Sequence, residues 1–458
     1  MSYFGRELTS NSTSGAGSYF SATSTMQPTM MMTVTPFALV RFVPARAVSF
    51  RVMTAATGVA ARTDRRPVAG GVHDPKAGTT FVSWGGTNED SYVQAFRHGR
   101  WSAPLKIIDG RGDSHNYPTM VQADDGHLVV VVGMYNGETV VARSPQPHTI
   151  DGEWSSRVVA EGAAASYPMP FKAANGHLFV FFREATRTVD PSAPTDNRPM
   201  LFMRSTDHGV TWQSSKQLTG LPYALGSTDR ADNLNEIYVG QLRYQRWPER
   251  VHLVWTLAGG GPAQHRHDYY HKDIHYAWFD PNALIFYAAD GTDLGPQLTN
   301  DEMEGPCKVA VTPLERTADV VSPDYIQLVG WLRNGRPFVV WFTRDAALGF
   351  HDFASVWTPR GWRTSEVATG LRTREMEQIG PDTWRVYTTA DGQPGIATHR
   401  LEHGRGWTPE TVIPTPKPVA RIELITRFRD PARILATGAS SAREVTVADG
   451  DVYVAGQD

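Results

Sequence analysis

The segment Ser205-Thr206-Asp207-His208-Gly209-Val210-Thr211-Trp212 carries the pattern S-x-D-x-G-x-T-W, which suits a tight turn between two β-strands. The aspartate can accept backbone N–H groups of the turn, and the glycine can adopt the positive φ angle that such a turn needs. The tryptophan can pack between sheets. Because every residue type in the segment has a folding role, we interpret the motif as structural rather than catalytic.

Short strand-like runs surround this turn from about Val68 to the end of the chain, and no long amphipathic helix interrupts them. Many runs follow Asp-Gly or Asn-Gly pairs, as at Asp125-Gly126 and Asn334-Gly335, which favours hairpins. A tryptophan preceded by a turn recurs roughly every 40–55 residues where the repeat is clear. These tryptophans are Trp101, Trp154, Trp212, Trp362 and Trp407. The repeat predicts an all-β chain folded as a β-propeller of about seven blades, with a two-domain β protein as the main alternative.

Composition sets limits on the domain organisation and on the partners. After Glu7 no acidic residue appears before Asp64, so we expect residues 1–65 to be a disordered leader or the product of a misassigned start codon, and residues 66–458 to be one propeller domain. The net charge of -3 gives no reason to expect nucleic acid as a partner, and no apolar run is long enough for a membrane span. The single cysteine, Cys307, excludes an intramolecular disulfide. We expect a monomer.

Polar and aromatic residues that could do chemistry stand where two strand groups begin. His115 lies among turn-forming residues in Asp113-Ser114-His115-Asn116-Tyr117-Pro118. Tyr167 opens the next group in Ser166-Tyr167-Pro168, and the strand that follows ends at Arg183-Glu184. Loops at the starts of propeller blades face a central funnel, so these side chains are candidates for an acid, a base and a cation.

These segments resemble the bacterial-neuraminidase-repeat polysaccharide lyases, the seven-bladed propellers of ulvan lyase and rhamnose-glucuronate lyase type. The family's H-N-x-P segment is similar to His115-Asn116-Tyr117-Pro118, and its Tyr-x-x-Pro strand leading to an arginine is similar to Tyr167, Pro170 and Arg183. A later family tyrosine falls on Tyr238, whereas Tyr135 stands where the family commonly has a second histidine. The resemblance implies an acidic polysaccharide substrate and an exported protein.

The resemblance implies β-elimination on a uronate-containing glycan, and we expect His115 and Tyr167 to act as base and acid, in either order. Arg183 would neutralise the uronate carboxylate, whose charge grows in the transition state. Because an arginine beside Tyr167 favours its phenolate, that tyrosine could serve as both base and acid. Candidate substrate-binding residues are Asn116, Tyr135, Tyr238 and Arg243.

Two other functions remain open from the sequence. Loss of the second family histidine favours a carbohydrate-binding propeller without catalysis. A sialidase-like glycoside hydrolase would share the turn motif, but the chain has no Arg-Ile-Pro segment, and no spacing singles out a carboxylate pair among Asp113, Glu184, Asp232 and Glu236.

One further cluster places four histidines within eleven residues: His265, His267, His271 and His275. In a loop that runs into a strand, His271 and His275 would lie on one face while the other two fold back, giving a site for Zn²⁺ or another divalent ion. We expect such a metal to be structural or to orient the substrate, since β-elimination requires no cofactor.

Overall fold

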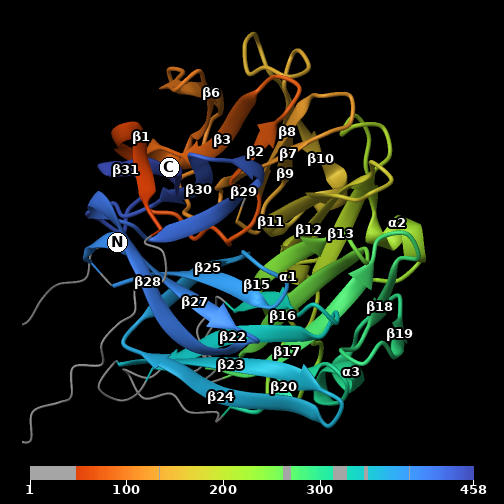
Figure 1. The fold of residues 1–458 in the computed structure, drawn as a ribbon. Coiled ribbons are helices and arrows are strands. Elements are labelled where there is room, and N and C mark those ends of the chain that lie inside the picture. The colour runs from red at the N-terminus through yellow and green to blue at the C-terminus, as the bar shows by residue number, and fades with distance from the viewer. Residues whose placement is uncertain (1–47, 134, 261–269, 313–326, 345–348, 391) are drawn as a thin grey trace, which may run out of the picture. The chain divides into compact units, whose positions relative to one another are not determined.

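The computed structural model describes residues 48–133, 135–260, 270–312, 327–344, 349–390 and 392–458, and within these the regular secondary structure is almost entirely β-strand (Figure 1). Residues 45–458 form one compact unit. The helical segments described in it are short: α1 (Thr186–Val189), α2 (Ser215–Thr219), α3 (Asn300–Glu304) and two turns of 3₁₀-helix at Thr87–Glu89 and Ala160–Gly162. None of the helices in the described part of the chain has the length and apolar character needed to cross a membrane.

The strands follow one another in antiparallel groups. The middle of the chain gives β7 (Pro118–Gln122), β8 (Leu128–Gly133), β9 (Thr139–Arg143) and β10 (Ser155–Val159), then β11 (Ala165–Lys172), β12 (Leu178–Glu184), β13 (Met200–Ser205) and β14 (Gln213–Ser214). The next group holds β15 (Glu236–Gln245), β16 (Arg250–Gly259), β17 (Tyr270–Asp280), β18 (Ile285–Tyr287), β19 (Asp293–Gly295) and β20 (Lys308–Ala310). Two four-stranded groups follow: β21 (Leu328–Trp331), β22 (Pro337–Arg344), β23 (Phe350–Thr358) and β24 (Gly361–Thr369), then β25 (Arg372–Gln378), β26 (Thr383–Thr389), β27 (Pro394–Glu402) and β28 (Arg405–Pro418).

The two ends of the described chain share a nine-stranded sheet. Its strands are β1 (Phe50–Ala60), β31 (Gly450–Gln457), β30 (Ala432–Thr437), β29 (Arg421–Arg429), β2 (Gly71–Asp74), β3 (Thr79–Gly85), β4 (Ser91–Arg97), β5 (Arg100–Trp101) and β6 (Leu105–Ile108). A single parallel pairing, Val72 with Thr426, joins its two halves. Because this sheet combines two groups, the number of about seven blades stays a prediction.

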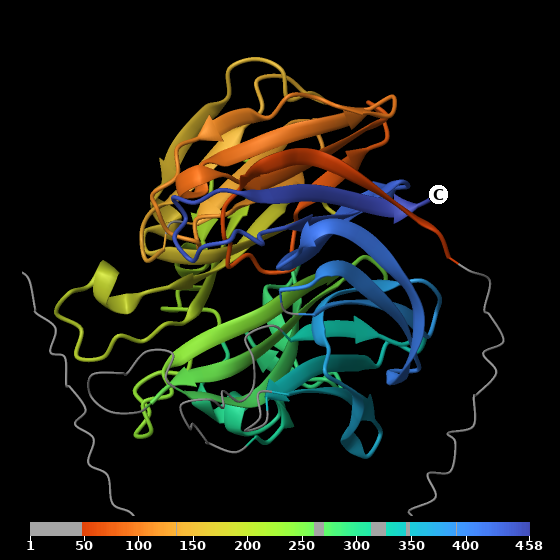
Figure 2. The ribbon, with the colours of Figure 1, turned by 90° about the vertical axis from the view of Figure 1, so that its left-hand side faces the viewer.

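The first strand and the last strand lie side by side (Figure 2). Met53 pairs with Val454 and Phe50 pairs with Gln457, so β1 closes the sheet that contains the carboxyl-terminal strand. The sequence-based boundary at residue 65 differs here: residues 50–60, expected to belong to the leader, form a strand, and Arg65 is buried. The acid-poor composition of this segment reflects a strand with small and apolar residues rather than a lack of structure.

The turn motif at residues 205–212 has the structural role expected from its sequence. The Asp207 carboxylate accepts a hydrogen bond from the Thr211 backbone N–H at 2.8 Å and from the Thr211 hydroxyl at 2.6 Å, and Gly209 has a φ of 85°. Trp212 is buried in a cluster with residues of neighbouring strands, among them Val129 and Leu178. The motif therefore anchors one strand group against the next.

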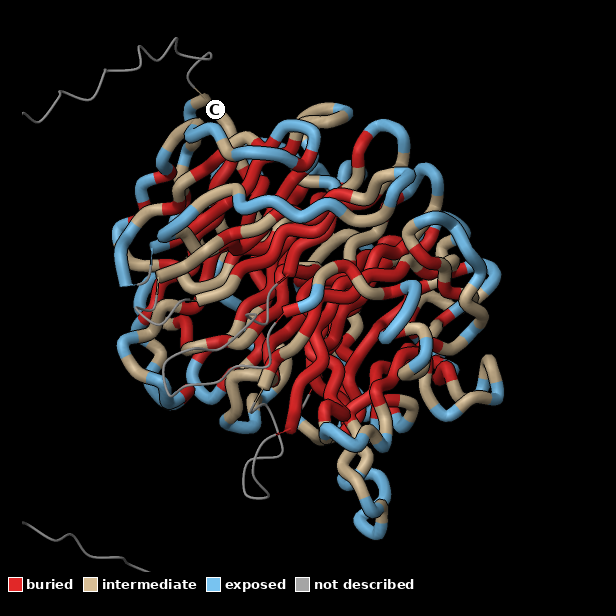
Figure 3. Tube along the Cα trace, turned by 90° about the horizontal axis from the view of Figure 1, so that it is seen from below, coloured by how far each residue is buried: buried red, intermediate tan, exposed pale blue. Residues whose placement is uncertain are grey.

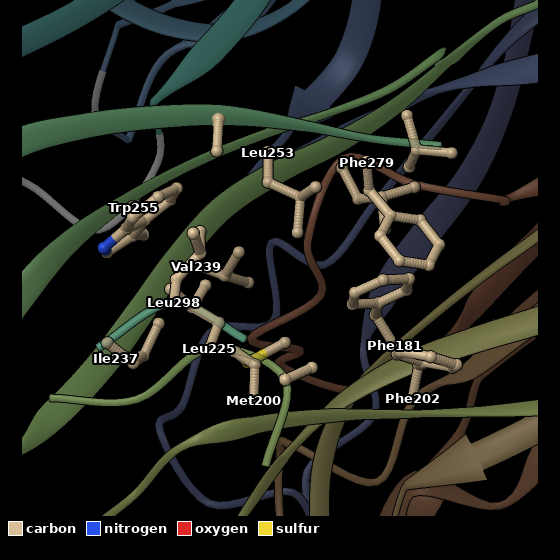
Figure 4. Close-up of a cluster of buried hydrophobic side chains, with 14 of the residues drawn as sticks. Phe181, Met200, Phe202, Leu225, Ile237, Val239, Leu253, Trp255, Phe279 and Leu298 are labelled. Carbon is tan, nitrogen blue, oxygen red and sulfur yellow. The ribbon is translucent and has the colours of Figure 1, made fainter. Parts of the chain in front are cut away.

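Apolar side chains fill the spaces between neighbouring strand groups. Figure 3 shows the buried positions gathered along the strands and the exposed ones along the connecting loops. In one cluster Phe181, Phe202 and Phe279 pack with ring centroids 5.2–5.4 Å apart, beside Trp255 and Leu253 (Figure 4). Each such ring stabilises the fold by about 2–3 kcal/mol through burial alone.

A central cavity of about 610 Å³ is lined by residues of β2, β7, β11, β15, β25 and β29, each of which leads its antiparallel group in the chain. Lining of one cavity by the leading strands of successive sheets is the arrangement of a propeller. The loops that precede neighbouring leading strands meet at one end of this cavity, as the side-chain contacts below show. The all-β propeller fold predicted from the sequence is therefore confirmed.

Candidate active site

The residues predicted as acid and base meet where neighbouring leading strands begin. His115 precedes β7, Tyr167 lies near the start of β11, and Tyr238 lies near the start of β15. The ring centroids of His115 and Tyr167 are 5.2 Å apart, and those of Tyr167 and Tyr238 are 6.2 Å apart. Residues distant in sequence thus form one continuous aromatic cluster.

His115 is held by two carboxylates. Its Nδ1 lies 2.5 Å from Asp113 Oδ1, and the same oxygen accepts the His115 backbone N–H at 2.8 Å. On the other side of the ring, Nε2 lies 3.8 Å from Asp64 Oδ2. The imidazole side chain is 20% exposed, so a ligand can reach it. A carboxylate on Nδ1 leaves Nε2 as the nitrogen available for proton transfer.

The two carboxylates keep their negative charge. Burial acts against it at Asp113, but the hydrogen bonds from the side chain and backbone of His115 lower the pKa of this carboxyl. Burial likewise opposes the charge on Asp64, whereas Arg421, His115 and the Ser114 hydroxyl hold its pKa well below the ordinary value. Both groups therefore favour a positive charge on His115 once it accepts a proton.

Tyr167 has an unusual backbone conformation, with φ at 59° in a residue that carries a Cβ. It lies in an irregularity of β11, where the pairing register with β12 shifts between Ser166 and Met169. Left-handed backbone at a bulky residue costs on the order of 1–3 kcal/mol, and such strain is found at functional sites. The bulge turns the phenol toward His115.

Two guanidinium groups lie over the Tyr167 ring: Cζ of Arg66 is 4.3 Å and Cζ of Arg183 is 4.8 Å from its centroid. Arg183 also lies 4.6 Å from the ring centroid of Tyr238. Positive charge close to a phenol stabilises the phenolate relative to the neutral form. The cluster can therefore lower the cost of removing the Tyr167 proton.

Arg183 is enclosed, with its side chain 1% exposed and Glu236 Oε2 3.5 Å from Nη1. Burial opposes its charge, but Tyr167, Tyr238 and Glu236 together raise the pKa of the guanidinium. The guanidinium is therefore a buried positive charge in contact with two phenol rings, and it favours negative charge in their neighbourhood.

A family model described as a BNR repeat-containing family member matches residues 79–369, which is more than half of the chain. The chain belongs to this family. It is 24% identical over 242 residues to an ulvan lyase of Pseudoalteromonas sp. (strain PLSV) and 25% identical over 237 residues to an ulvan lyase of Alteromonas sp. (strain LOR). The matches cover 44% and 43% of this chain and 44% of each relative, so they span less than half the length of either.

A solved ulvan lyase structure, bound to a chain of glucuronic acid and 3-sulfated rhamnose, superposes with a TM-score of 0.66. The alignment covers 89% of this chain and 96% of the ulvan lyase at 17% identity. This similarity extends the propeller fold over the strands on both sides of the region that the family model matches.

Two predicted ligand-binding residues of this BNR-repeat protein have structural contacts beside His115. Asn116 is buried, and its Oδ1 accepts the Tyr135 backbone N–H at 2.9 Å. Tyr135 itself is 41% exposed, and its ring stacks on His115 with centroids 4.4 Å apart. Tyr135 therefore presents an exposed aromatic ring next to the candidate base.

Arg243 is not part of this cluster. It lies five residues beyond Tyr238 on β15, roughly 15 Å along an extended strand, where it contacts Glu375 and Gln241 and lines the central cavity. Its guanidinium carbon is 5.3 Å from the Trp384 ring centroid. A role in substrate binding beside His115 is not supported by this position, and the sequence could not show how far down the strand the funnel extends.

The histidine-rich segment is only partly described, because His265 and His267 lie outside the described residues. The expectation that His271 and His275 share one face of the strand is wrong. A bulge at Asp273, with φ at 58°, shifts the β16–β17 register, so His271 contacts Tyr238 and Thr256 whereas His275 stacks on Trp255. Among the described residues no group of three or more His, Cys, Asp or Glu is arranged to hold a metal. The predicted divalent ion remains untested.

Sequence reasoning missed Arg66 and Asp64, which contact Tyr167 and His115. Asp64 falls in the expected leader and Arg66 opens the expected propeller domain, and Asp64-Arg65-Arg66-Pro67 precedes the leading strand β2 much as residues 113–117 precede β7. That equivalence of position was the signal that could have found them. His115, Tyr167, Arg183 and Tyr238 are brought together as expected, and their roles stay predictions.

Proposed function

We propose that this protein is a polysaccharide lyase that cleaves a uronate-containing glycan by β-elimination. The observation that carries the proposal is the contact of His115, held by Asp113, with the ring of Tyr167, over which two arginines lie. The similarity to two ulvan lyases supports the reaction class and an acidic polysaccharide as substrate. The roles of individual residues rest on the geometry.

The reaction needs one proton removed and one delivered. One of the pair His115 and Tyr167 takes the C5 proton of the uronate, the C4–C5 double bond forms, and the bond from C4 to the glycosidic oxygen breaks. The other member protonates that leaving oxygen. Each proton transfer contributes roughly 10²- to 10⁴-fold to the rate when the group is well positioned.

Charge in the transition state gathers on the uronate carboxylate. We assign Arg183 to neutralise it, since its guanidinium carbon lies 4.8 Å from the Tyr167 ring centroid and 4.6 Å from that of Tyr238. Arg66 adds positive charge beside Tyr167. The same charges favour the phenolate, so Tyr167 can serve as base and then as acid while His115 stabilises the substrate. We assign no step to a metal ion.

Incubation with uronate polysaccharides, including ulvan, gum arabic, pectin and glycosaminoglycans, tests the proposal through the ultraviolet absorbance of the unsaturated uronate product. Tyr167→Phe and His115→Ala are each expected to reduce turnover about 10²-fold or more while binding stays measurable. Tyr287→Phe, on β18 and stacked on Trp278 away from the cluster, is the matched control and should keep full activity. Full activity in Tyr167→Phe would contradict the proposed proton transfer.

A second function is favoured by Tyr135, whose exposed ring replaces a histidine of the related lyases. An open aromatic face can stack on a sugar ring, as in a carbohydrate-binding propeller that has no catalytic activity. The same experiment separates the two functions, because such a protein would bind a polysaccharide of the panel and release no unsaturated product from any of them.

A further inference from the structure

A second cavity, of about 760 Å³, opens beside the candidate active site. Its lining residues include the starts of β25 and β29, the end of β28 and part of the connection between β30 and β31. Its six basic residues are Arg62, Arg372, Arg374, Lys417, Arg421 and Arg443, against Asp64 and Asp449 in the lining and Asp451 outside it, whose Oδ1 lies 2.9 Å from Lys417 Nζ. All of its described lining lies outside residues 79–369, the part matched by the family model.

The wall formed by residues 438–449 is held in place by its own hydrogen bonds. Asp449 Oδ1 accepts the Ser441 backbone N–H at 2.8 Å and the Ser440 hydroxyl at 3.0 Å. The Val445 carbonyl accepts the Asn88 backbone N–H at 2.8 Å, which ties the loop to the neighbouring strand group. The cavity is thus preformed, and the charge of Asp449 is engaged by serines rather than directed at a ligand.

Asp64 connects this cavity to the catalytic candidates. Its Oδ1 lies 3.2 Å from Arg421 and 3.4 Å from Arg62, both of which line the cavity, whereas its Oδ2 lies 3.8 Å from His115 Nε2. A single residue, Asp64, therefore contacts both His115 and the arginines that line the cavity.

We propose that this cavity, hereafter the basic cleft, binds a carboxylate or sulfate group on a second sugar of the glycan whose uronate lies at His115. The proposal rests on the function proposed above and specifies its substrate: an acidic group is required on a residue beyond the bond that is cleaved. The excess of positive charge suits a polyanion. No aromatic side chain is in the described lining, which disfavours a ligand held by stacked bases.

Lys417 and Arg443 are the residues to change, because Lys417 is 43% exposed at its side chain and Arg443 is exposed in the wall loop. The double variant Lys417→Gln/Arg443→Gln removes two charges from the basic cleft. Arg360→Gln/Arg405→Gln is the matched control, since it removes two charges from exposed turns that do not line the cleft. Unchanged melting temperatures would establish that both double variants fold. If Lys417→Gln/Arg443→Gln does not fold, Arg62→Gln takes its place in the experiment.

Binding is measured with native and desulfated ulvan in a His115→Ala background, so that turnover does not interfere. We expect the cleft variant to weaken binding of native ulvan about 5- to 30-fold relative to the control, and to reduce the dependence of Kd on salt. If the cleft variant loses affinity for native ulvan but not for desulfated ulvan, the bound group is sulfate. If it loses affinity for both forms, the bound group is carboxylate. Equal Kd values for the cleft variant and the control on both forms would overturn the proposal.

The same variants with His115 retained separate a failure of the basic cleft from a failure of the proposed lyase function. In an active lyase the cleft variant should raise KM and leave kcat unchanged. Turnover without any cleft effect on KM or Kd rejects the cleft and leaves the lyase standing. A cleft effect on Kd in a protein that releases no unsaturated product rejects the lyase and shows the cleft serving a binding protein.

Discussion

At the scale of single residues, the candidate site consists of a phenol and an imidazole whose surroundings carry opposite charge. Tyr167 lies under the guanidinium groups of Arg66 and Arg183, and His115 lies between Asp113 and Asp64. The first arrangement stabilises a negative tyrosine, and the second stabilises a positive histidine. Each residue has its own charged neighbours. Proton transfer between the substrate and Tyr167, or between the substrate and His115, therefore does not depend on a partner that the two residues share.

Asp113→Asn tests whether the carboxylate on His115 Nδ1 matters for the reaction. The amide keeps the size of the side chain but stabilises the protonated imidazole less, so kcat should fall about 10²-fold or more with KM little changed. Steady-state kinetics measures both parameters.

Asp109→Asn is the control for this substitution, because Asp109 lies in the same loop region and its side chain is 83% exposed. It should leave kcat and KM unchanged. A kcat for Asp113→Asn equal to that of the wild type would show that the carboxylate has only a structural role.

The sequence predicts the identity of these residues better than their orientation. His115, Tyr167 and Tyr238 could be found because each stands at the start of a strand group, and those starts converge in a propeller. The contact of Asp64 with His115 comes instead from the segment before β2, where composition alone predicted a leader. Exposure was also unpredictable: Arg183 is enclosed by the rings of Tyr167 and Tyr238, which come from two different strands, and by Glu236.

At the scale of strands, two bulges determine which way functional side chains point. One in β11 accompanies the positive φ of Tyr167, and one in β17 separates the faces of His271 and His275. A one-residue insertion moves every following side chain to the other face of the strand. Periodicity cannot locate such an insertion when neither residue is a glycine, which explains why the predicted histidine face was wrong.

Packing between neighbouring strand groups creates a second titratable site far from the aromatic cluster. Asp352 on β23 is fully buried, and its Oδ1 accepts the hydroxyl of Thr373 on β25 at 2.8 Å. Burial raises the pKa of Asp352 to about 7, and the hydrogen bond from Thr373 offsets this only in part. The folded protein thus holds a proton that the unfolded chain, with an ordinary carboxyl, releases near pH 4.

Asp352→Asn is therefore expected to stabilise the protein at high pH. Between about pH 4 and pH 7 the unfolded state binds fewer protons than the folded state, so the wild type loses stability as pH rises and reaches a constant loss above pH 7. The amide keeps the acceptor for Thr373 and does not titrate. The gain should be near zero at pH 4 and reach up to about 4 kcal/mol at pH 8.

Denaturation by urea at pH 4, 6 and 8 measures this gain. Glu402→Gln, at a side chain that is 62% exposed on β27, is the control and should show no comparable pH-dependent gain. A gain for Asp352→Asn that is the same at all three pH values would place the effect in packing rather than in titration.

At the scale of the whole described chain, the fold could be predicted from repeated turns and tryptophans, but its closure could not. Those signals are local, whereas closure depends on which strand pairs with the last one. β1 takes that place, and its residues Phe50–Ala60 contain no charged residue except Arg51, so composition made them look like a continuation of the leader. The pairing of β1 with β31 joins positions about 400 residues apart, a contact that no periodicity reveals.

Met53→Asp tests whether this closure supports the rest of the propeller. Met53 is 9% exposed, faces a cluster that includes Trp84 and Leu435, and pairs with Val454 on β31. A carboxylate there would be buried without a partner, which costs several kcal/mol, so the melting temperature should fall by about 5 °C or more. Thr54→Asp adds the same charge one residue along, on the exposed side of the strand, and should leave the melting temperature within about 2 °C of the wild type. Calorimetry measures the melting temperatures of the two variants. A much lower melting temperature for Met53→Asp than for Thr54→Asp would show that residues 50–60 belong to the propeller, whereas two unchanged melting temperatures would show that these residues do not support it.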